Sequence, residues 1–383
     1  MKLAVIGRGT AGAQTIAHLQ KHMGREEIEW HFDPNIPTQA VGEGSTRDLP
    51  NNLFYNLDFD YNDLDKIDGS VKTGVYKSGW GKNLPNFIHS FVPGDVSLHF
   101  NAKSLQNYVL DKLKDKVKIV EHNITADEID ADYIIDCSGV PKELDEFHIP
   151  KYITINSAHV TQCYWDAPRF THTLAIARPY GWVFGIPLQN RCSIGYMYNK
   201  DFNTLEEVKE DVKNVFKEYN LNPSNETNSF TFKNYYRKQN FTNRVAYSGN
   251  ASFFLEPLEA TSVSCMDMIQ RSVWDILNGV QTVESMNQKY IHRLESIERM
   301  IMLHYFSGSN WDTDFWKYAQ SRGEQCMIDS KFNKEFVSFC NPKGDSFSRV
   351  ENTNHELGTW PMSSYYQNIN SLGIKEKLHA IQR

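Results

Sequence analysis

Apolar and polar positions at the N-terminus follow first the period of a β-strand and then that of a helix. Residues 2–6 form a short apolar run, residues 11–22 carry apolar side chains at helical spacing, and residues 27–32 are again strand-like. Arg8 follows closely on the first apolar run, which is too short to be the core of a signal peptide. The pattern therefore predicts that the chain opens with a βαβ unit.

Further segments of both kinds continue this arrangement. Residues 105–113 have the spacing of a helix, and residues 117–120 and 133–135 are typical of buried strands. A strand at residues 245–249, followed by a long helix from about Thr261, returns to the same pattern. We therefore expect a doubly wound sheet that is assembled from segments distant in sequence.

The middle of the chain has a different pattern. Residues 153–198 alternate between apolar and polar positions, which favours a separate antiparallel sheet, and residues 205–219 have the pattern of an amphipathic helix. Further helices are expected after the long helix, through about residue 305. Beyond residue 332 the sequence is polar and aromatic, with little periodicity.

The composition excludes several classes of protein. A chain of 383 residues, 40% of them hydrophobic, can form roughly two to three domains or one elaborate enzyme fold. Its net charge of −7 gives no support for binding nucleic acid or an anionic membrane, and no apolar run is long enough to span a bilayer. Six cysteines without Cys-x-x-Cys spacing indicate reduced thiols, so we expect a cytoplasmic protein that holds no metal.

A glycine-rich turn directly follows the first predicted strand and opens the first predicted helix. Residues 7–12 read Gly-Arg-Gly-Thr-Ala-Gly, and an acidic residue lies about twenty residues further on, where a ribose hydroxyl would need it. The glycines allow a tight turn, close approach of a pyrophosphate and close packing of helix on strand. The dinucleotide-binding residues expected here are Gly7, Gly9, Thr10, Ala11, Gly12 and Asp33.

Residues 181–187, Gly-Trp-Val-Phe-Gly-Ile-Pro, place two large aromatic side chains on one face of an extended segment. An aromatic core strand is the plain structural interpretation. The segment also resembles the Trp-x-Trp-x-Ile-Pro signature of flavin-dependent halogenases of the tryptophan-halogenase type, with phenylalanine in place of the second tryptophan. The residues that carry this signature are Trp182, Phe184, Ile186 and Pro187.

Two further segments favour FAD over NAD as the dinucleotide. Residues 132–139 resemble the second strand and turn of FAD-dependent oxygenases and halogenases, and residues 41–46 resemble the flexible flavin loop of the halogenases. An ordinary strand ending in a turn is the alternative for residues 132–139. The resemblance adds Val41, Gly42, Glu43, Gly139, Gly249 and Pro257 to the expected cofactor-binding residues.

An acidic turn precedes the long helix that begins near residue 261. Pro257 forces a turn, and the unpaired N–H groups at the start of the following helix favour an anion there. A helix with an acidic first turn is the bland alternative. The segment resembles the halogenase turn that holds a halide: Glu259 matches its glutamate, and Thr261 and Ser262 match its halide-side residues, although many members have glycine where Ser262 stands.

Lys77 lies among apolar and aromatic residues, where desolvation would favour its neutral, nucleophilic amine. Most lone lysines are solvated surface charges. By resemblance Lys77 matches the catalytic lysine of the halogenases. His89 and Phe91 resemble the family's His-x-Phe pair beside the aromatic substrate, with a packed core as the alternative, and residues 303–305 and 312–316 resemble a helical region that we treat as architectural.

The resemblance implies a flavin-dependent halogenase that uses FAD as FADH2, O2 and a halide ion (chloride, bromide or iodide). A separate flavin reductase would supply the reduced flavin, and hypohalous acid would pass through Lys77 to an electron-rich aromatic substrate of indole or phenol type. Glu259 would polarise the hypohalous acid or remove the ring proton. A flavin-dependent aromatic monooxygenase and a non-catalytic flavin-binding scaffold are the alternatives, and homo-oligomerisation stays open.

The expected fold is α/β, an FAD-binding Rossmann-like fold of the flavoprotein monooxygenase type with an antiparallel substrate sheet and a helical C-terminal part. We expect a discontinuous FAD-binding module at residues 1–80, 95–150 and 240–280. A substrate-side β-sheet module is expected at 81–94 and 151–239, and a helical region at 281–383. The chain is shorter than typical family members, so tryptophan is not assumed as the substrate.

Overall fold

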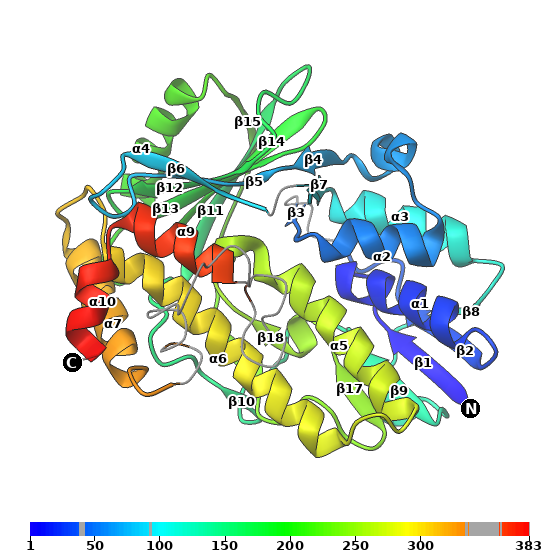
Figure 1. Ribbon diagram of the computed structural model, residues 1–383. Coiled ribbons are helices and arrows are strands. Elements are labelled where there is room, and N and C mark those ends of the chain that lie inside the picture. The colour runs from blue at the N-terminus through cyan, green and yellow to red at the C-terminus, as the bar shows by residue number, and fades with distance from the viewer. Residues whose placement is uncertain (38–42, 92–93, 334–335, 337–359, 361, 383) are drawn as a thin grey trace. The chain divides into compact units, whose positions relative to one another are not determined.

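The computed structural model describes residues 1–37, 43–91, 94–333, 336, 360 and 362–382 (Figure 1). The chain forms two compact units, each built from separate stretches of sequence. The first comprises Met1–Lys72, Ser97–Ile149 and Tyr235–Ile291, and the second comprises Thr73–Val96, Pro150–Asn234 and His292–Arg383.

The first unit is organised by a five-stranded sheet of order β17-β9-β1-β2-β8, in which every neighbouring pair is parallel. The strands are β1 (Lys2–Ile6), β2 (Glu27–Phe32), β8 (Lys118–Glu121), β9 (Tyr133–Asp136) and β17 (Val245–Tyr247). The predicted βαβ opening and the return of the chain near residue 245 are confirmed. The parallel sheet and the helical C-terminal part likewise confirm the mixed α/β class.

Helices and two small sheets complete the first unit. The helices are α1 (Thr10–Met23), α2 (Asp48–Leu57), α3 (Ala102–Leu113) and α5 (Thr261–Leu277), with short 3₁₀ turns η1 (Tyr61–Ile67), η2 (Ala126–Glu128), η3 (Gly249–Ala251) and η4 (Leu258–Ala260). One small sheet has the order β3-β7-β4, and its strands are β3 (Glu43–Gly44), β7 (Ser97–Phe100) and β4 (Ser70–Lys72). The other small sheet has the order β10-β16-β18, and its strands are β10 (Phe147–His148), β16 (Tyr235–Arg237) and β18 (Phe253–Phe254).

The second unit contains a seven-stranded sheet of order β15-β11-β14-β13-β12-β5-β6. Its strands are β5 (Gly74–Ser78), β6 (Asn86–Ser90), β11 (Ser157–Tyr164), β12 (Thr173–Arg178), β13 (Gly181–Pro187), β14 (Arg191–Tyr198) and β15 (Asn222–Thr231). The pair β12 and β5 is parallel and the other neighbours are antiparallel, which confirms the predicted antiparallel sheet.

The amphipathic helix predicted near residue 205 is α4 (Leu205–Glu218). Thr204 and Glu207 form a reciprocal capping box that fixes its first turn. Its apolar face, with Val208, Val212 and Val215, joins the buried cluster formed by the side chains of the sheet. The spacing of these valines is what holds the helix on the sheet.

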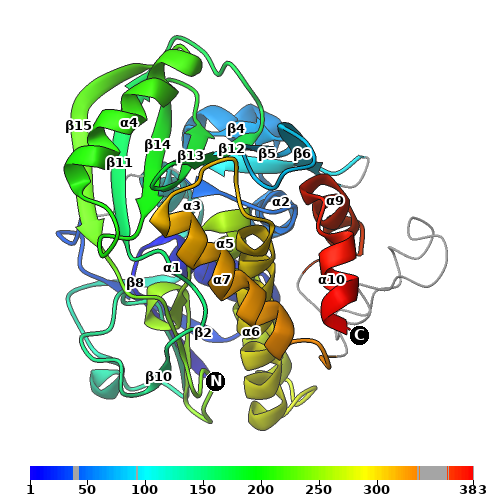
Figure 2. The same ribbon diagram turned by 90° about the vertical axis from the view of Figure 1, so that its left-hand side faces the viewer.

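Three of the remaining helices lie wholly in the second unit: α7 (Asp314–Asp329), α9 (Met362–Leu372) and α10 (Lys375–Gln382). The helix α6 (Val283–Ser307) starts in the first unit and ends in the second. Helix α9 packs against β6 and α10 against α7, and both C-terminal helices are drawn red in Figure 2. The sequence after residue 332 shows little periodicity, so α9 and α10 were expected only as part of a helical region at 281–383 and not as individual helices.

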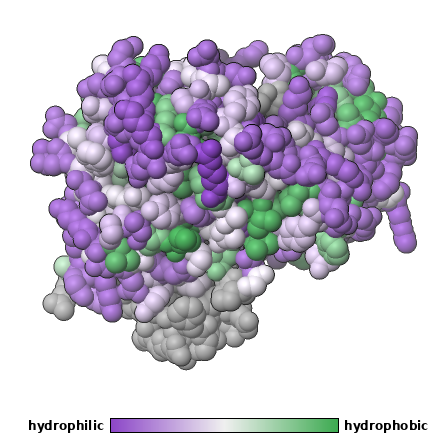
Figure 3. All heavy atoms as spheres, turned by 90° about the horizontal axis from the view of Figure 1, so that it is seen from above, coloured by the Kyte–Doolittle hydropathy of each residue, from purple (hydrophilic) through white to green (hydrophobic). Residues whose placement is uncertain are grey.

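The surface seen in Figure 3 is largely hydrophilic, with scattered hydrophobic residues. Within the described part of the chain, every helix is too short or too polar to cross a membrane. Five cysteines lie in this part, and all five are buried thiols that form no disulfide with one another. The sixth, Cys340, lies outside the described residues.

Candidate active site

At two of the three glycines in the turn between β1 and α1, close contacts leave no room for a side chain. A Cβ atom on Gly7, whose φ is +94°, would lie 2.3 Å from the carbonyl oxygen of Cys137. A Cβ on Gly12 would lie 2.1 Å from the carbonyl oxygen of Gly7. A Cβ on Gly9, in contrast, would meet no described atom within 4 Å. The first and third glycines serve packing, and the second faces open space, as a pyrophosphate site requires.

The N-terminus of α1 is directed at this space without a side-chain cap among the described residues. Thr10 donates a hydrogen bond from its hydroxyl to Oε1 of Glu43 over 2.7 Å, which connects the helix start to the predicted flavin loop. Helix N–H groups without internal partners can bind phosphate oxygens. The geometry therefore fits a dinucleotide, with Val41 and Gly42 of the predicted site outside the described residues.

The other predicted cofactor residues lie at the ends of strands in the same unit. Asp33 follows β2, and its Oδ1 accepts hydrogen bonds from the backbone N–H and the side-chain amide of Asn35. Gly139 follows β9 with a φ of +113°, and a Cβ on it would meet no described atom within 4 Å. A Cβ on Gly249 would lie 2.7 Å from that of Ala11, so the turn after β17 reaches the start of α1.

The acidic turn before α5 adopts an unusual backbone. Glu259 has a φ of +73° and Ala260 a φ of +56°, so two consecutive residues with side chains are in the left-handed region. Each such residue costs on the order of 1–3 kcal/mol unless its surroundings enforce it. The side chain of Glu259 is buried, and Pro257 immediately precedes the turn. The strain is typical of functional turns.

The start of α5 carries the residues expected to face a halide. The helix begins at Thr261, as predicted, and no described side chain caps it. Oγ1 of Thr261 is buried and has no hydrogen-bond partner among the described residues, while Ser262 is half-buried. An uncapped helix start with an orphaned buried hydroxyl fits a small anion.

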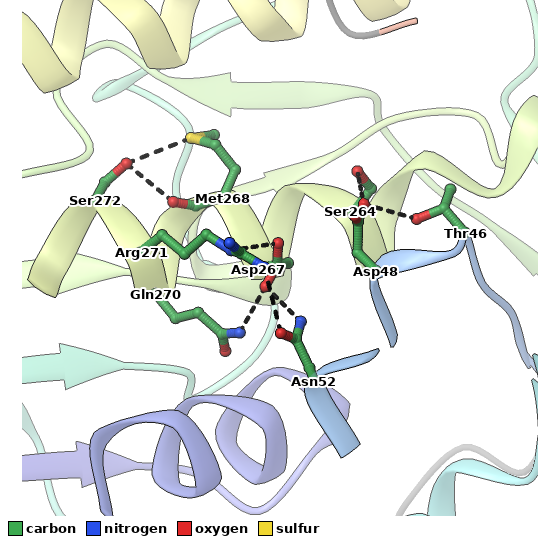
Figure 4. A network of polar contacts seen from close by, with 9 residues as sticks. All are labelled: Thr46, Asp48, Asn52, Ser264, Asp267, Met268, Gln270, Arg271 and Ser272. Atoms are coloured by element: carbon green, nitrogen blue, oxygen red, sulfur yellow. Dashed lines mark hydrogen bonds and ion pairs between the residues drawn. The ribbon is translucent and has the colours of Figure 1, made fainter. Parts of the chain in front are cut away.

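A network of polar contacts fixes α5 against α2 close to this turn (Figure 4). Asp267 is buried, and its carboxylate accepts hydrogen bonds from Asn52 on α2 and from Gln270 and Arg271 one turn further along α5. Ser264 also donates to Asp48 at the start of α2. These contacts hold the beginning of α5, and with it the strained turn, in place.

Lys72 is a second buried lysine that sequence reasoning did not identify. Its side chain is 1% exposed, and its Nζ donates to the carbonyl oxygen of Ser45 over 2.9 Å. Burial lowers the pKa of Lys72 to about 8, while the negative charge of Glu259 acts in the opposite direction. Only the tertiary structure reveals this relation, because 187 positions separate the two residues (259 − 72).

Lys77 lies on β5, paired in register with Phe87 of β6 and Ala175 of β12. Its side chain is fully buried, at 0% exposure. Its Nζ contacts Nε2 of His304 on α6, and it donates to Oδ1 of Asn368 on α9 over 2.7 Å. The solvated-charge interpretation of this lysine therefore does not apply, and the amine is held by side chains from two helices.

The predicted pair His89 and Phe91 lies at the end of β6. His89 is buried, and its Nε2 lies 2.9 Å from the hydroxyl of Ser364 on α9, one helical turn before Asn368. Phe91, just beyond the strand, is half-buried. Helix α9 thus contacts both Lys77 and His89, and brings together two residues that the sequence analysis assigned to one site.

The signature segment forms β13 and is buried throughout. The ring of Phe184 lies directly over Gly195, since a Cβ there would be 2.0 Å from Cζ of the ring. Trp182 lies between Phe184, at 6.3 Å between ring centroids, and Trp80, at 6.5 Å. The segment is therefore a buried aromatic strand, as the plain structural interpretation expected. Ile186 and Pro187 continue the same buried strand.

The aromatic cluster continues from Trp80 toward the lysine. The ring of Trp80 lies 5.8 Å from that of His304, 5.7 Å from that of Tyr305 and 5.3 Å from that of Trp316. Residues 303–305 and 312–316 were interpreted as architectural, and Trp316 fits that role. His304 does more, because it also contacts Lys77. No local signal distinguished it from any other helical histidine.

Each compact unit therefore holds one set of predicted site residues. The first contains the glycine turn, Glu259, Thr261 and Ser262, and the second contains Lys77, His89 and the β13 aromatics. No group of three or more potential metal ligands occurs in the described part of the chain.

Comparison with protein families gives a match over nearly the whole chain. The model of the family described as "Tryptophan halogenase" matches residues 2–112 and 97–380. A tryptophan 7-halogenase from Lentzea aerocolonigenes, RebH, is 25% identical over 417 aligned positions, covering 82% of this chain and 78% of its own. A 7-chloro-L-tryptophan 6-halogenase from Kutzneria sp. (strain 744), KtzR, is 25% identical over 236 residues, covering 56% of this chain and 44% of its own.

Solved structures show the same fold at lower identity. MibH, a tryptophan 5-halogenase, superposes with a TM-score of 0.81 at 17% identity, covering 100% of this chain and 89% of its own. BrvH, a flavin-dependent halogenase from Brevundimonas sp. BAL3, superposes with a TM-score of 0.79 at 18% identity, covering 97% of this chain and 90% of its own.

Proposed function

This chain belongs to the tryptophan halogenase family, and from that premise we propose that it is a flavin-dependent halogenase of an electron-rich aromatic substrate. The observation that carries the proposal is the burial of Lys77, whose amine is held by His304 and Asn368. A lysine that served only solubility would have no reason to be fully buried. A buried amine can react with an electrophile as a nucleophile.

The residues around the glycine turn would hold FAD. Gly9 would admit the pyrophosphate at the start of α1, while Gly7 and Gly12 pack the turn, and Asp33 would bind the ribose. When bound in reduced form, FAD would supply with O2 the oxidising equivalent that converts halide to hypohalous acid. A separate flavin reductase would provide the reduced form.

The turn before α5 would hold the halide. Thr261 offers an orphaned buried hydroxyl and Ser262 the next N–H group of an uncapped helix. Both groups donate hydrogen bonds, which a halide needs in place of its water shell. Glu259 would polarise the hypohalous acid or accept the proton that leaves the aromatic ring.

The substrate would be an electron-rich aromatic ring of indole or phenol type. The names of RebH and MibH describe tryptophan halogenases. Near the end of β6, His89 offers an imidazole and Phe91 a phenyl ring that could contact such a substrate. The buried aromatics Trp182 and Phe184 would act as a wall that keeps the substrate away from the flavin.

The test is a product screen with enzymically reduced FAD, O2 and each of chloride, bromide and iodide, against indoles and phenols, read by mass spectrometry. We expect halogenated products whose isotope pattern follows the halide supplied. Hydroxylated products without halogen would instead identify an aromatic monooxygenase. Absence of any turnover, with FAD bound, would support a flavin-binding scaffold.

The residue-level test compares Lys77→Met with Lys82→Met, which removes an exposed lysine from the loop after β5. Methionine keeps the length of the buried side chain, so Lys77→Met should still bind and oxidise reduced flavin but lose halogenation. Lys82→Met should behave as wild type. Halogenation by Lys77→Met at a wild-type rate would refute the assigned role.

A further inference from the structure

We propose that His304 is the positioning residue that receives the proton of Lys77 when its amine reacts. The inference rests on the proposed halogenase function and deepens it, because it assigns the base that makes the lysine nucleophilic. Family resemblance placed His304 in an architectural helix. Its contact with Nζ of Lys77 gives it a chemical role.

The hydrogen bonds of His304 define which nitrogen can accept a proton. Its Nδ1 lies 2.8 Å from the carbonyl oxygen of Met300, one turn earlier on α6. A carbonyl oxygen can only accept, so Nδ1 must carry the hydrogen. In the neutral ring Nε2 then has a lone pair, and that lone pair is directed at Lys77.

Asn368 is oriented in the same way from a different helix. Its Nδ2 donates to the carbonyl oxygen of Ser364, one turn earlier on α9, over 3.0 Å. This bond directs the amide oxygen, and not the amide nitrogen, to Nζ of Lys77. Two neutral acceptors, each fixed by a backbone carbonyl of its own helix, therefore face the same amine.

The two acceptors differ in what they can do with a proton. An amide oxygen accepts a hydrogen bond but is not basic near neutral pH, whereas imidazole is the side chain whose protonation changes in this range. His304 and Asn368 are both 0% exposed, so bulk water does not solvate either group. His304 is thus the base and Asn368 the fixed acceptor.

Other titratable groups on the elements around Lys77 in this unit have partners of their own. They include His89 of β6, Tyr305 of α6, Tyr365 of α9 and Arg178 of β12. His89 pairs with Ser364, and Arg178 forms an ion pair with Asp211. His304 contacts Nζ of Lys77 directly through Nε2.

The step balances with the hypohalous acid of the proposed function as the co-reactant. The Nζ–H bond of the ammonium breaks and its proton moves to Nε2 of His304. The electron pair left on Nζ attacks the halogen, so that the N–X bond forms and the X–O bond breaks. The departing hydroxide takes a second Nζ proton as water, which leaves a neutral haloamine and an imidazolium. The halogen keeps its oxidation state, and no further oxidant is required.

The first experiment compares kcat against pH for His304→Gln and Asn368→Leu. Glutamine keeps an acceptor but is not basic, so His304→Gln should lower kcat about 100-fold near pH 7 with an unchanged aromatic-substrate KM. The loss should shrink as pH rises, because a larger share of the lysine is then already neutral at equilibrium and needs no base. Asn368→Leu should lower kcat with the wild-type pH profile. A loss in His304→Gln that is the same at every pH, or no loss, would overturn the proposal.

The second experiment is independent of turnover. Nitrogen-15 NMR of the histidine-labelled protein without flavin should find His304 as the Nδ1–H tautomer, with an Nε2 signal that shifts in Lys77→Met. An Nε2–H tautomer, or a signal unaffected by Lys77→Met, would overturn the pairing. If the wild type makes no halogenated product but the NMR result holds, the proposed function fails and the pairing stands. Tryptophan fluorescence of each variant serves as the folding control, because Trp80, Trp182 and Trp316 lie in the same unit as His304.

Discussion

The packing of Phe184 on Gly195 leads to a prediction with a defined magnitude. The two residues are paired in register on β13 and β14, and a Cβ on Gly195 would lie 2.0, 2.2 and 2.7 Å from three atoms of the ring. Ordinary contact between carbon atoms needs about 3.5 Å or more. In Gly195→Ala the ring must therefore move by more than 1 Å, against the buried side chain of Trp182.

Overpacking of this kind costs on the order of 1–3 kcal/mol when neighbours cannot give way. The matched double variant Gly195→Ala with Phe184→Leu removes the ring that causes the clash. We expect Gly195→Ala to be destabilised by about 2 kcal/mol in the wild-type background. With leucine at position 184 the same substitution should cost less than about 0.5 kcal/mol.

Urea unfolding followed by tryptophan fluorescence measures both values, because Trp80, Trp182 and Trp316 are all in the second unit. The difference between the two costs is the coupling free energy between the alanine and the ring. An equal cost of Gly195→Ala in both backgrounds would refute the reasoning. If the ring also walls off the substrate, Gly195→Ala should raise the share of hydroxylated product in the halogenase assay.

Three further predictions concern the first unit. Burial alone would raise the pKa of Glu29, but hydrogen bonds from two lysines and a histidine lower it to about 2, from 4.5. Because Lys118 is largely exposed and solvent screens its charge, Glu29→Gln should cost only about 1–2 kcal/mol at pH 7. The cost should vanish as pH falls from 4.5 to 2 and the native carboxylate is protonated, which acid titration of urea unfolding checks. Asp267→Ala should cost about 1–3 kcal/mol in the same assay, since it leaves Asn52 without its acceptor, and an unchanged midpoint would contradict this. Gly7→Ala should lower both thermal stability and FAD affinity, whereas Gly9→Ala should lower FAD affinity alone. Thermal unfolding measures the first property, and titration followed by flavin fluorescence measures the second.

Local patterns in the sequence were sufficient for the five parallel strands of the first unit and for α1, α3 and α5, but not for α2 or the two small sheets. The glycine turn between β1 and α1, the strand at 27–32 and the start of α5 at Thr261 were all predicted at or near their observed positions. Each depends on neighbours in sequence: apolar period, glycine spacing, or a proline before a helix. The seven-stranded sheet was recognised in its central strands, but the C-terminal helices α9 and α10 were expected only as part of a helical region, without bounds of their own.

The amino-acid sequence by itself determined the family of this protein and singled out Lys77 as the candidate catalytic lysine. The glycine turn, the β13 signature and the acidic turn all occur within short segments, so a linear pattern contains them completely. Only the tertiary structure decided what surrounds Lys77. Its partners His304 and Asn368 are 227 and 291 positions away, and such contacts arise from packing of helices on a sheet, which no local pattern encodes. The tautomer of His304 is likewise set by a backbone carbonyl whose direction exists only once α6 has formed.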